Sequence, residues 1–385
     1  MEDKRIILKG ITWNHSRGFT PMVATSQRFS ELNPNVEIKW EKRSLQAFAD
    51  FSVQQLAEVY DLLVIDHPWA GFAARTQSIL PLDSYLSEAD LKDQRDHSVG
   101  HSYISYHFDG HQWALPIDAA TPVASSRGDL LKKYGMQLPK TYKELLAIAD
   151  SGKVGFSLIP IDTLMSFYMF CCSLGEDPCQ TEQQVISNEI GTKALQLFKQ
   201  LADKVDERFH HYNPIQVYET MVNTDELVYC PFAYGYSNYA RYGYADRVLH
   251  FHDLVSLNDK GNMRSTLGGT GLAVSAKCTH IEEAIKYLGY VAPPACQQGL
   301  YFDNGGQPGH LKAWKAVHTN KSSGNYFYIT LPALERALLR PRYHGHMFFQ
   351  DHAGDIVREY IIKGGEEQIV LAKLNELYHE SKVLV

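Results

Sequence analysis

The stretch that decides the fold is Gly110–Ala124, GHQWALPIDAATPVA. An Asp109-Gly110 turn leads into it, a short apolar strand is expected over Trp113–Leu115, and Pro116 precedes a polar-tipped segment. A passage of this kind, one third of the way along the chain, is suited to a crossing from one lobe to another. We therefore expect two lobes around this crossing, with a ligand cleft between them.

Length and charge limit the class of protein. A chain of 385 residues is too long for one ordinary hydrophobic core, so two domains are expected. The formal net charge of −7 and the lack of a Lys/Arg run argue against nucleic acid as a partner. No apolar run reaches about 18 residues, so no transmembrane helix is expected.

Strands and helices alternate in the first part of the chain. Arg5–Trp13, Val36–Trp40 and Asp61–Asp66 have the composition of strands, and helical segments separate them. This alternation predicts an α/β lobe with a mainly parallel sheet. Ligands of such sheets bind in the crevice beyond the carboxyl ends of the strands. The loops Trp13–Arg17 and Asp66–Trp69 are therefore expected in the same crevice.

These two loops supply the first candidate ligand-binding residues. Their aromatic rings could serve as a platform for a polar ligand, and their polar groups could form hydrogen bonds with it. The alternative is a capping loop with Trp13 in the core. The candidates are Trp13, Asn14, His15 and Arg17 in the first loop, and Asp66, His67 and Trp69 in the second.

Further candidates lie later in the chain. Asp118 follows the crossing, where it could contact a ligand or form a hydrogen bond in a hinge. Tyrosines of the segment CPFAYGYSNYARYGY could stack on a sugar ring, and the glycines of STLGGTG could bring backbone donors close to a ligand or form a tight lobe junction. These sets are Tyr234, Tyr236 and Tyr239, and Gly268, Gly269 and Thr270. Asp303, Asn304 and Arg342 are further candidates.

No cofactor or metal is expected. The pairs His250-x-His252 and His344-x-His346 each place two imidazoles on one strand face, but no third ligand stands at a telling spacing. Nucleotide-binding and nucleophile-elbow motifs are absent from the sequence. A cytosolic enzyme acting through Asp66, Asp118 or Cys230 remains the alternative to a binding protein, as does a cytosolic metabolite sensor.

The order of motifs resembles the extracellular solute-binding proteins of ABC importers, in particular the maltose-type, family 1 sugar-binding group. The resemblance rests on six passages in the family's order: Ile6–Gly18, Ser26–Trp40, Tyr60–Leu86, Phe108–Ala149, Leu267–Gly309 and Ala337–Val357. It implies an α/β, two-lobe periplasmic-binding-protein-like (type II) fold with the ligand cleft between lobes that close by a hinge motion. Lobe 1 would hold residues 1–115 plus 262–312, and lobe 2 residues 116–261 plus 313–385.

The resemblance also implies a function. The protein would capture a small polar solute, a sugar or sugar-like compound, and present it as a monomer to the membrane permease of an ABC importer. Because of Arg17 and the histidines, an acidic solute stays an alternative to a sugar. The opening MEDKRIILKG enters a strand with no secretory leader. Two locations therefore stay open: periplasmic or extracellular if a leader has been removed, or cytoplasmic.

Overall fold

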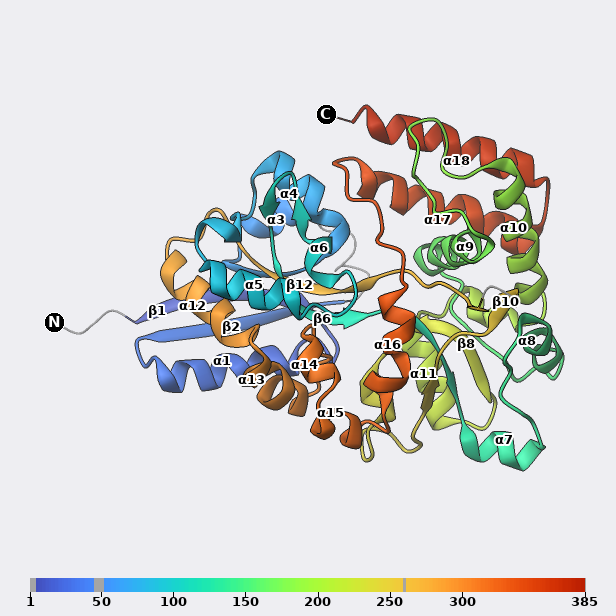
Figure 1. Ribbon diagram of the computed structural model, residues 1–385, viewed down its shortest axis with the longest axis horizontal. Coiled ribbons are helices and arrows are strands. Elements are labelled where there is room, and N and C mark those ends of the chain that lie inside the picture. Colours follow the sequence, from blue (N-terminus) through green and yellow to red (C-terminus); the bar gives the residue numbers. More distant parts are fainter. Residues whose placement is uncertain (1–4, 45–51, 259–260, 385) are drawn as a thin grey trace. The chain divides into compact units, whose positions relative to one another are not determined.

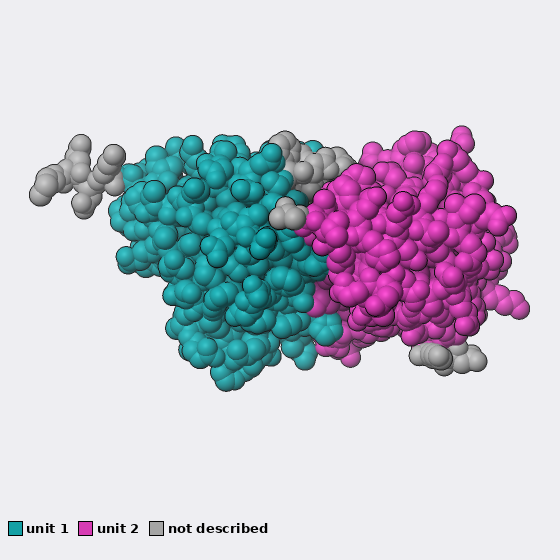
Figure 2. Space-filling model, turned by 90° about the horizontal axis from the view of Figure 1, so that it is seen from above, with its two compact units in different colours: residues 1–120, 268–321, 342–344 teal, residues 121–267, 322–341, 345–385 magenta. Residues whose placement is uncertain are grey.

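The computed structural model describes residues 5–44, 52–258 and 261–384. The chain divides into two compact units, which Figure 2 draws in different colours. Unit 1 comprises residues 1–120, 268–321 and 342–344, and unit 2 comprises residues 121–267, 322–341 and 345–385. Each lobe boundary expected from the sequence falls earlier in the chain than the corresponding unit boundary. Residues 342–344, expected in lobe 2, belong to unit 1.

Unit 1 is built on a five-stranded sheet with the strand order β2-β1-β3-β12-β6 (Figure 1). Strand β1 pairs in parallel with β2 and β3, whereas β12 pairs antiparallel with both β3 and β6. The amino end of β12 therefore lies at the same edge as the carboxyl ends of β3 and β6. The strands are β1 (Ile6–Trp13), β2 (Val36–Arg43), β3 (Leu62–Asp66), β6 (Leu115–Ala120) and β12 (Gly268–Val274).

Helices α1 (Thr20–Leu32) and α12 (Ile281–Val291) contribute to the hydrophobic core of unit 1. The rings of Phe29 and Tyr287 meet edge to face with centroids 5.3 Å apart, and the Thr25 and Tyr287 hydroxyls lie 2.8 Å apart. The other helices of this part of the chain are short. They are α3 (Val53–Ala57), α4 (Ala70–Thr76), α5 (Glu88–Asp96), α6 (Ser102–Ser105), α13 (Pro294–Cys296), α14 (Leu311–Trp314) and α15 (Val317–Ser322).

The stretch Gly110–Ala124 contains more strand than its sequence predicted. The Asp109-Gly110 turn is confirmed, with φ of 50° and 79°, and it joins β4 (His107–Phe108) to β5 (His111–Gln112). The strand expected at Trp113–Leu115 instead begins at Leu115 and runs through Pro116 to Ala120. Proline is tolerated there because β6 is the last strand of its sheet and its pairing with β12 is irregular next to this residue. The chain passes into unit 2 after Ala120, within the stretch that was expected to form the crossing.

Unit 2 combines small sheets with long helices (Figure 1). Its three-stranded antiparallel sheet has the order β8-β7-β9, and β10 pairs with β11 in a separate ribbon. The strands are β7 (Pro122–Ser126), β8 (Tyr229–Tyr234), β9 (His250–His252), β10 (Ser256–Asn258) and β11 (Gly261–Asn262). The helices are α7 (Gly128–Tyr134), α8 (Tyr142–Ala149), α9 (Pro160–Leu174), α10 (Asn188–Ala202), α11 (Pro214–Asn223), α16 (Tyr326–Glu335), α17 (His346–Lys363) and α18 (Glu367–Lys382).

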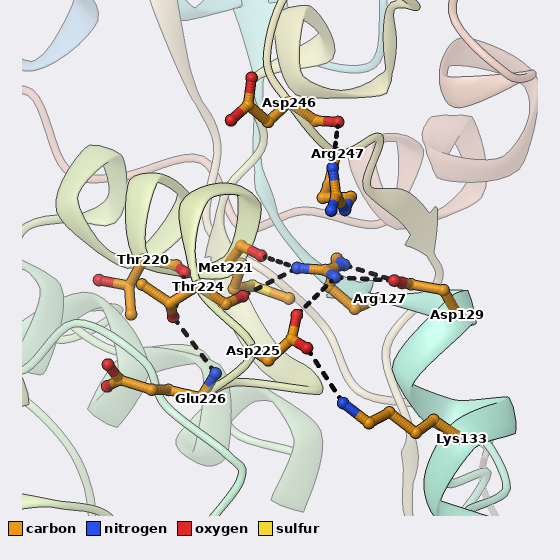
Figure 3. Close-up of polar contacts among 10 residues, drawn as sticks. All are labelled: Arg127, Asp129, Lys133, Thr220, Met221, Thr224, Asp225, Glu226, Asp246 and Arg247. Carbon is orange, nitrogen blue, oxygen red and sulfur yellow. Dashed lines mark hydrogen bonds and ion pairs between the residues drawn. The ribbon is translucent and has the colours of Figure 1, made fainter.

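A buried arginine ties the start of α7 to the end of α11 (Figure 3). The Arg127 Nη1 atom donates to the carbonyl oxygens of Met221 and Thr224 at 2.6 and 2.9 Å. The carboxylates of Asp129 and Asp225 accept from the other nitrogens of the same guanidinium. The last carbonyls of a helix lack partners within it, so a cation there stabilises the helix end. This network serves the architecture of unit 2.

Within the described residues, no helix combines the length and the apolar character needed to cross a bilayer.

Candidate functional site

Three polar residues stand in a row across the carboxyl-end edge of the unit 1 sheet. Asp66 ends β3, Thr270 lies near the start of β12, and Asp118 lies in β6. The strand register pairs Thr270 with Asp66 on one side and with Asp118 on the other. Residues paired across neighbouring strands point to the same face of a sheet. The structure thus brings together three candidates that come from separate parts of the sequence; we call them the polar row.

Arg17 forms a buried ion pair with the polar row. Its Nε atom donates to Asp118 Oδ2 at 2.8 Å, and its Nη2 atom donates to Asp118 Oδ1. The two side chains are only 5% and 0% exposed. Burial raises the pKa of the Asp118 carboxyl, while the Arg17 guanidinium and the Thr270 backbone N–H oppose the rise. With both groups charged, this bidentate contact neutralises the charge of Arg17 within the protein.

The Thr270 hydroxyl is the group in the polar row that lacks a partner. Its side chain is buried, with 7% of the residue exposed, and its Oγ1 atom makes no hydrogen bond within the described part of the chain. Leaving a buried polar group without a hydrogen bond costs about 1–3 kcal/mol. Such exceptions are uncommon in folded proteins and call for a specific reason. A hydroxyl group of a ligand would satisfy this atom.

Asp66 is the carboxylate of the polar row that retains access to solvent. Its side chain is 27% exposed, whereas the neighbouring His67 is almost completely buried. Asp66 Oδ1 accepts the His67 backbone N–H at 2.8 Å and lies 3.2 Å from His67 Nδ1. The His67 ring meets Tyr106 edge to face. His67 therefore supports the carboxylate, which remains partly exposed.

The first loop divides between packing and polar roles. Trp13 belongs to the hydrophobic core, and a Cβ atom added at Gly18 would lie 2.4 Å from its indole ring. Asn14 is exposed. The His15 Nδ1 atom accepts the Arg17 backbone N–H at 2.9 Å. Burial, and then the charge of Arg17, lower the pKa of His15 to about 4, so this imidazole is neutral at pH 7.

Two more candidates make close contacts inside unit 1. Trp69 is buried and meets Phe72 edge to face, with ring centroids 5.3 Å apart. Gly269, which follows Gly268 at the start of β12, has φ of 99°, and a Cβ atom there would lie 2.4 Å from the Asp118 carbonyl oxygen. The absence of a side chain at Gly269 thus permits the close approach of β12 to β6.

The tyrosines lie in unit 2. Tyr234 is the last residue of β8, and Tyr236 is buried, with its ring 6.2 Å from that of Tyr218. The Tyr239 hydroxyl donates to Glu219 Oε1 at 2.6 Å, and its ring lies 5.2 Å from Tyr218. The rings of Tyr236 and Tyr239 form an aromatic cluster with Tyr218. Their contact with a ligand stays a prediction.

Asp303 and Arg342 lie outside the polar row. Asp303 Oδ1 accepts a hydrogen bond from His318 Nε2 at 2.6 Å if that nitrogen is protonated, and both side chains are more than half exposed. Arg342 Nη1 donates to the carbonyl oxygens of Ile104 and His107 at 2.6 and 2.7 Å. Burial lowers the pKa of Arg342. Both residues have partners that account for them within unit 1.

The structure removes the basis for Cys230 as a nucleophile. Its thiol is fully buried in β8, and burial raises its pKa to about 12. A nucleophilic cysteine needs a lowered pKa, because the thiolate is the reactive form. His252 is also neutral at pH 7, since burial lowers its pKa to about 4. Within the described chain, neither His-x-His pair belongs to a group of three potential metal ligands.

Sequence reasoning missed two residues next to the ion pair. Tyr301 is buried close enough to Arg17 and Asp118 for their charges to act on it, and burial raises its pKa. The Gln307 Nε2 atom donates to the Ala119 carbonyl oxygen at 2.8 Å. Both residues come from the segment after α12, and no local pattern marks them as neighbours of β6.

The family model described as "Bacterial extracellular solute-binding protein" matches residues 12–164. This part of the chain is similar in sequence to that family. No curated protein matches it in sequence. The sequence-based expectation of the family is confirmed, and the matched residues include Arg17, Asp66 and Asp118, whereas Thr270 lies outside them.

Solved structures of solute-binding proteins share the fold over almost the whole chain. One, from Agrobacterium radiobacter K84 in complex with ribitol, has a TM-score of 0.82 at 16% identity and covers 97% of this chain and 98% of that one. Maltose-bound MalE3 from T. maritima has a TM-score of 0.82 at 17% identity, covering 99% and 100%. A protein from Thermotoga lettingae TMO bound with alpha-D-tagatose has a TM-score of 0.81 at 17% identity, covering 97% and 100%. The expected solute-binding-protein fold is thus confirmed.

Proposed function

We propose that this chain captures a small, uncharged, polyhydroxylated solute, a sugar or a sugar alcohol, for uptake by an ABC importer. The observation that carries the proposal is the polar row, in which the buried Thr270 hydroxyl lacks a partner among the described residues and the Asp66 side chain is partly exposed. Hydroxyl groups of a solute can donate to Asp66 and exchange hydrogen bonds with Thr270.

The ion pair supports an uncharged solute. From the sequence alone, Arg17 could have bound an acidic solute. In the structure, Asp118 holds its guanidinium in a bidentate contact. The carboxylate that then faces solvent in the polar row is Asp66. A solute carboxylate would meet this negative charge, whereas a solute hydroxyl would donate a hydrogen bond to it. The charge pattern therefore favours sugars over sugar acids.

The similar structures support the same class of solute. Their bound molecules, ribitol, maltose and alpha-D-tagatose, are all uncharged and rich in hydroxyl groups. By the same likeness, we propose that the protein works outside the cytoplasm, as a monomer, and delivers its solute to a membrane permease. The cytosolic enzyme is not favoured, because the Cys230 thiol is buried and protonated at neutral pH.

The test is a binding screen followed by one substitution. Ribitol, D-tagatose, maltose and maltotriose are compared with sugar acids by the rise in melting temperature, since a ligand of the native state stabilises it. The affinity of the solute identified in this screen is then measured for the parent protein and for the variant Thr270→Val. We expect its affinity to fall roughly 3- to 10-fold, the loss of one hydrogen bond. The variant without solute should be at least as stable as the parent, because a buried unpaired hydroxyl has been removed.

Thr25→Val is the matched control. Thr25 is also buried in unit 1, but its hydroxyl donates to the Pro21 carbonyl oxygen at 2.7 Å and contacts the Tyr287 hydroxyl. This variant should lose stability and keep its affinity for the solute. The proposal fails if only sugar acids raise the melting temperature, or if Thr270→Val binds the solute as tightly as the parent.

A further inference from the structure

A second group of polar side chains in unit 1 has the composition of a metal site. Asp93, His97 and His310 each offer a ligand atom, and these atoms all lie within 4.8 Å of one another. Across residues 5–44, 52–258 and 261–384, no other three His, Cys, Asp or Glu side chains come together in this way. The three residues belong neither to the polar row nor to the His-x-His pairs of the sequence.

Two distances between these ligand atoms are close to those found around a single metal ion. His97 Nδ1 lies 2.8 Å from Asp93 Oδ1, and His310 Nε2 lies 3.1 Å from Asp93 Oδ2. Ligand atoms held about 2.0–2.2 Å from a tetrahedral zinc ion are roughly 3.3 Å apart. Opening each contact by a few tenths of an ångström would therefore admit an ion. Asp93 and His97 stand four residues apart at the end of α5, on the same side of the helix.

The backbone holds the third ligand in register with the first two. The Leu311 N–H donates to the His97 carbonyl oxygen at 2.7 Å, and Ser98 and His310 form an isolated antiparallel bridge. The two imidazole rings stack with centroids 5.4 Å apart and planes 16° apart. Since His310 is also almost completely buried, its ring has little freedom to turn away. The site is thus preorganised by main-chain contacts that do not depend on a metal.

Three contacts of the metal-free state oppose binding: one is made by His97 and two involve Lys312. The His97 Nδ1 atom lies 3.0 Å from the Asp93 backbone carbonyl oxygen, and a metal on Nδ1 would displace a hydrogen bond between them. The His310 Nδ1 atom accepts the Lys312 backbone N–H in a long hydrogen bond of 3.2 Å. A metal on Nε2 would move the ring proton to Nδ1 and break that bond, a small loss against three metal–ligand bonds. The Lys312 ammonium lies 3.2 Å from Asp93 Oδ1, but its side chain is about half exposed and can swing into solvent.

We propose that Asp93, His97 and His310 bind a Zn²⁺ ion. Two imidazole nitrogens and one carboxylate oxygen suit zinc and similar divalent transition metals, whereas calcium and magnesium prefer all-oxygen sites. Three protein ligands leave a fourth position for water. The ion would join α5 to the segment that leads into α14, two parts of unit 1 that are far apart in the sequence. Zinc binding should therefore stabilise unit 1.

The experiment uses the full chain without a histidine tag, treated with EDTA and transferred to chelator-free buffer. Zinc chloride alone is titrated by calorimetry, and melting is measured with and without zinc. We expect one equivalent to bind and to raise the melting temperature. His97→Gln, which alters the partly exposed ligand, should bind zinc at least about tenfold more weakly, because even the supports of ligands contribute 10- to 100-fold. Its melting temperature in EDTA should match the parent's.

Two further variants make the test specific. His111→Gln changes another histidine of unit 1 that is paired with one aspartate, Asp83, at 2.9 Å, and it should leave zinc binding unchanged. Lys312→Met removes the competing cation and should tighten binding by up to about tenfold. Zinc binding weaker than millimolar, or equal binding by the parent and His97→Gln, would overturn the site. Neither result depends on the solute that the polar row captures.

Discussion

Replacing Arg17 by methionine should cost unit 1 a large share of its stability. Methionine keeps most of the length and apolar surface of the arginine stem but leaves the Asp118 carboxylate without its guanidinium. That carboxylate is completely buried, and its remaining donor is the Thr270 backbone N–H. An uncompensated buried charge is among the few causes of a large loss of stability by a single substitution.

The magnitude follows from the contact. Two unit charges about 4 Å apart attract by about 4 kcal/mol at an effective dielectric constant of about 20. Removing one partner of a buried ion pair costs about 3–5 kcal/mol in practice. Arg17→Met and Asp118→Asn should each fall in this range. The double variant carries no buried charge, and its asparagine oxygen can still accept the Thr270 N–H, so it should lose about 2 kcal/mol or less.

Tryptophan fluorescence during urea unfolding is the suitable assay. All five tryptophans of the sequence lie in unit 1, so their signal follows this unit and not unit 2. In Arg17→Met, the buried Asp118 carboxyl should have a still higher pKa in the folded state than in the parent. It should therefore take up a proton as the pH falls, and the loss of stability caused by the substitution should become smaller. If the double variant loses as much as the two single variants together, the two residues do not act as a pair and the reasoning is refuted.

Two other predictions concern stability. In unit 2, loss of hydration raises the pKa of Asp162 to about 6, although Ser157 donates to it. The folded state therefore binds more protons than the unfolded state between about pH 4 and 6, and stability should fall as the pH rises through this window, by up to about 3 kcal/mol. Urea unfolding followed by circular dichroism should show that Asp162→Asn abolishes this slope; an unchanged slope would assign it to another group. In unit 1, Gly269→Ala should cost about 2–4 kcal/mol by tryptophan fluorescence, because it combines a positive φ with a clash against the Asp118 carbonyl oxygen. The control Gly289→Ala, exposed in α12 with open space around it, should instead stabilise by about 0.5–1 kcal/mol; equal effects of the two would contradict the strain argument.

The sequence was sufficient to place one edge of the site. Strand-forming composition marked β1, β2 and β3, and it is plainest in β3, where four of the five residues are buried. The rule that ligands bind beyond the carboxyl ends of parallel strands then singled out Asp66 and the loop that contains Arg17. Thr270 was also a candidate, but for the glycines beside it and not for its hydroxyl.

What each candidate does could not be predicted, because its partner lies elsewhere in the chain. Trp13 offered an aromatic platform in the sequence, and the structure packs it in the core against Gly18. Arg17 and Asp118 were separate candidates, yet they are 101 positions apart and bind each other. His310 followed no metal-like spacing, since its neighbours come from α5. Local patterns indicate where strands end, but only the tertiary fold decides which polar groups remain for a ligand.

There is a physical reason why the buried charges at the polar row are paired whereas a buried hydroxyl is not. A buried charge without a partner costs several kcal/mol, a large part of the stability of about 5–15 kcal/mol that a folded protein has. The fold therefore pairs Arg17 with Asp118. A single unpaired hydroxyl costs about 1–3 kcal/mol, which a large unit can tolerate, and the Thr270 hydroxyl is left without a partner among the described residues. Under the proposed function, the groups that such a protein can keep ready for a solute are hydroxyls and a half-exposed carboxylate, and these select hydroxyl groups rather than charges.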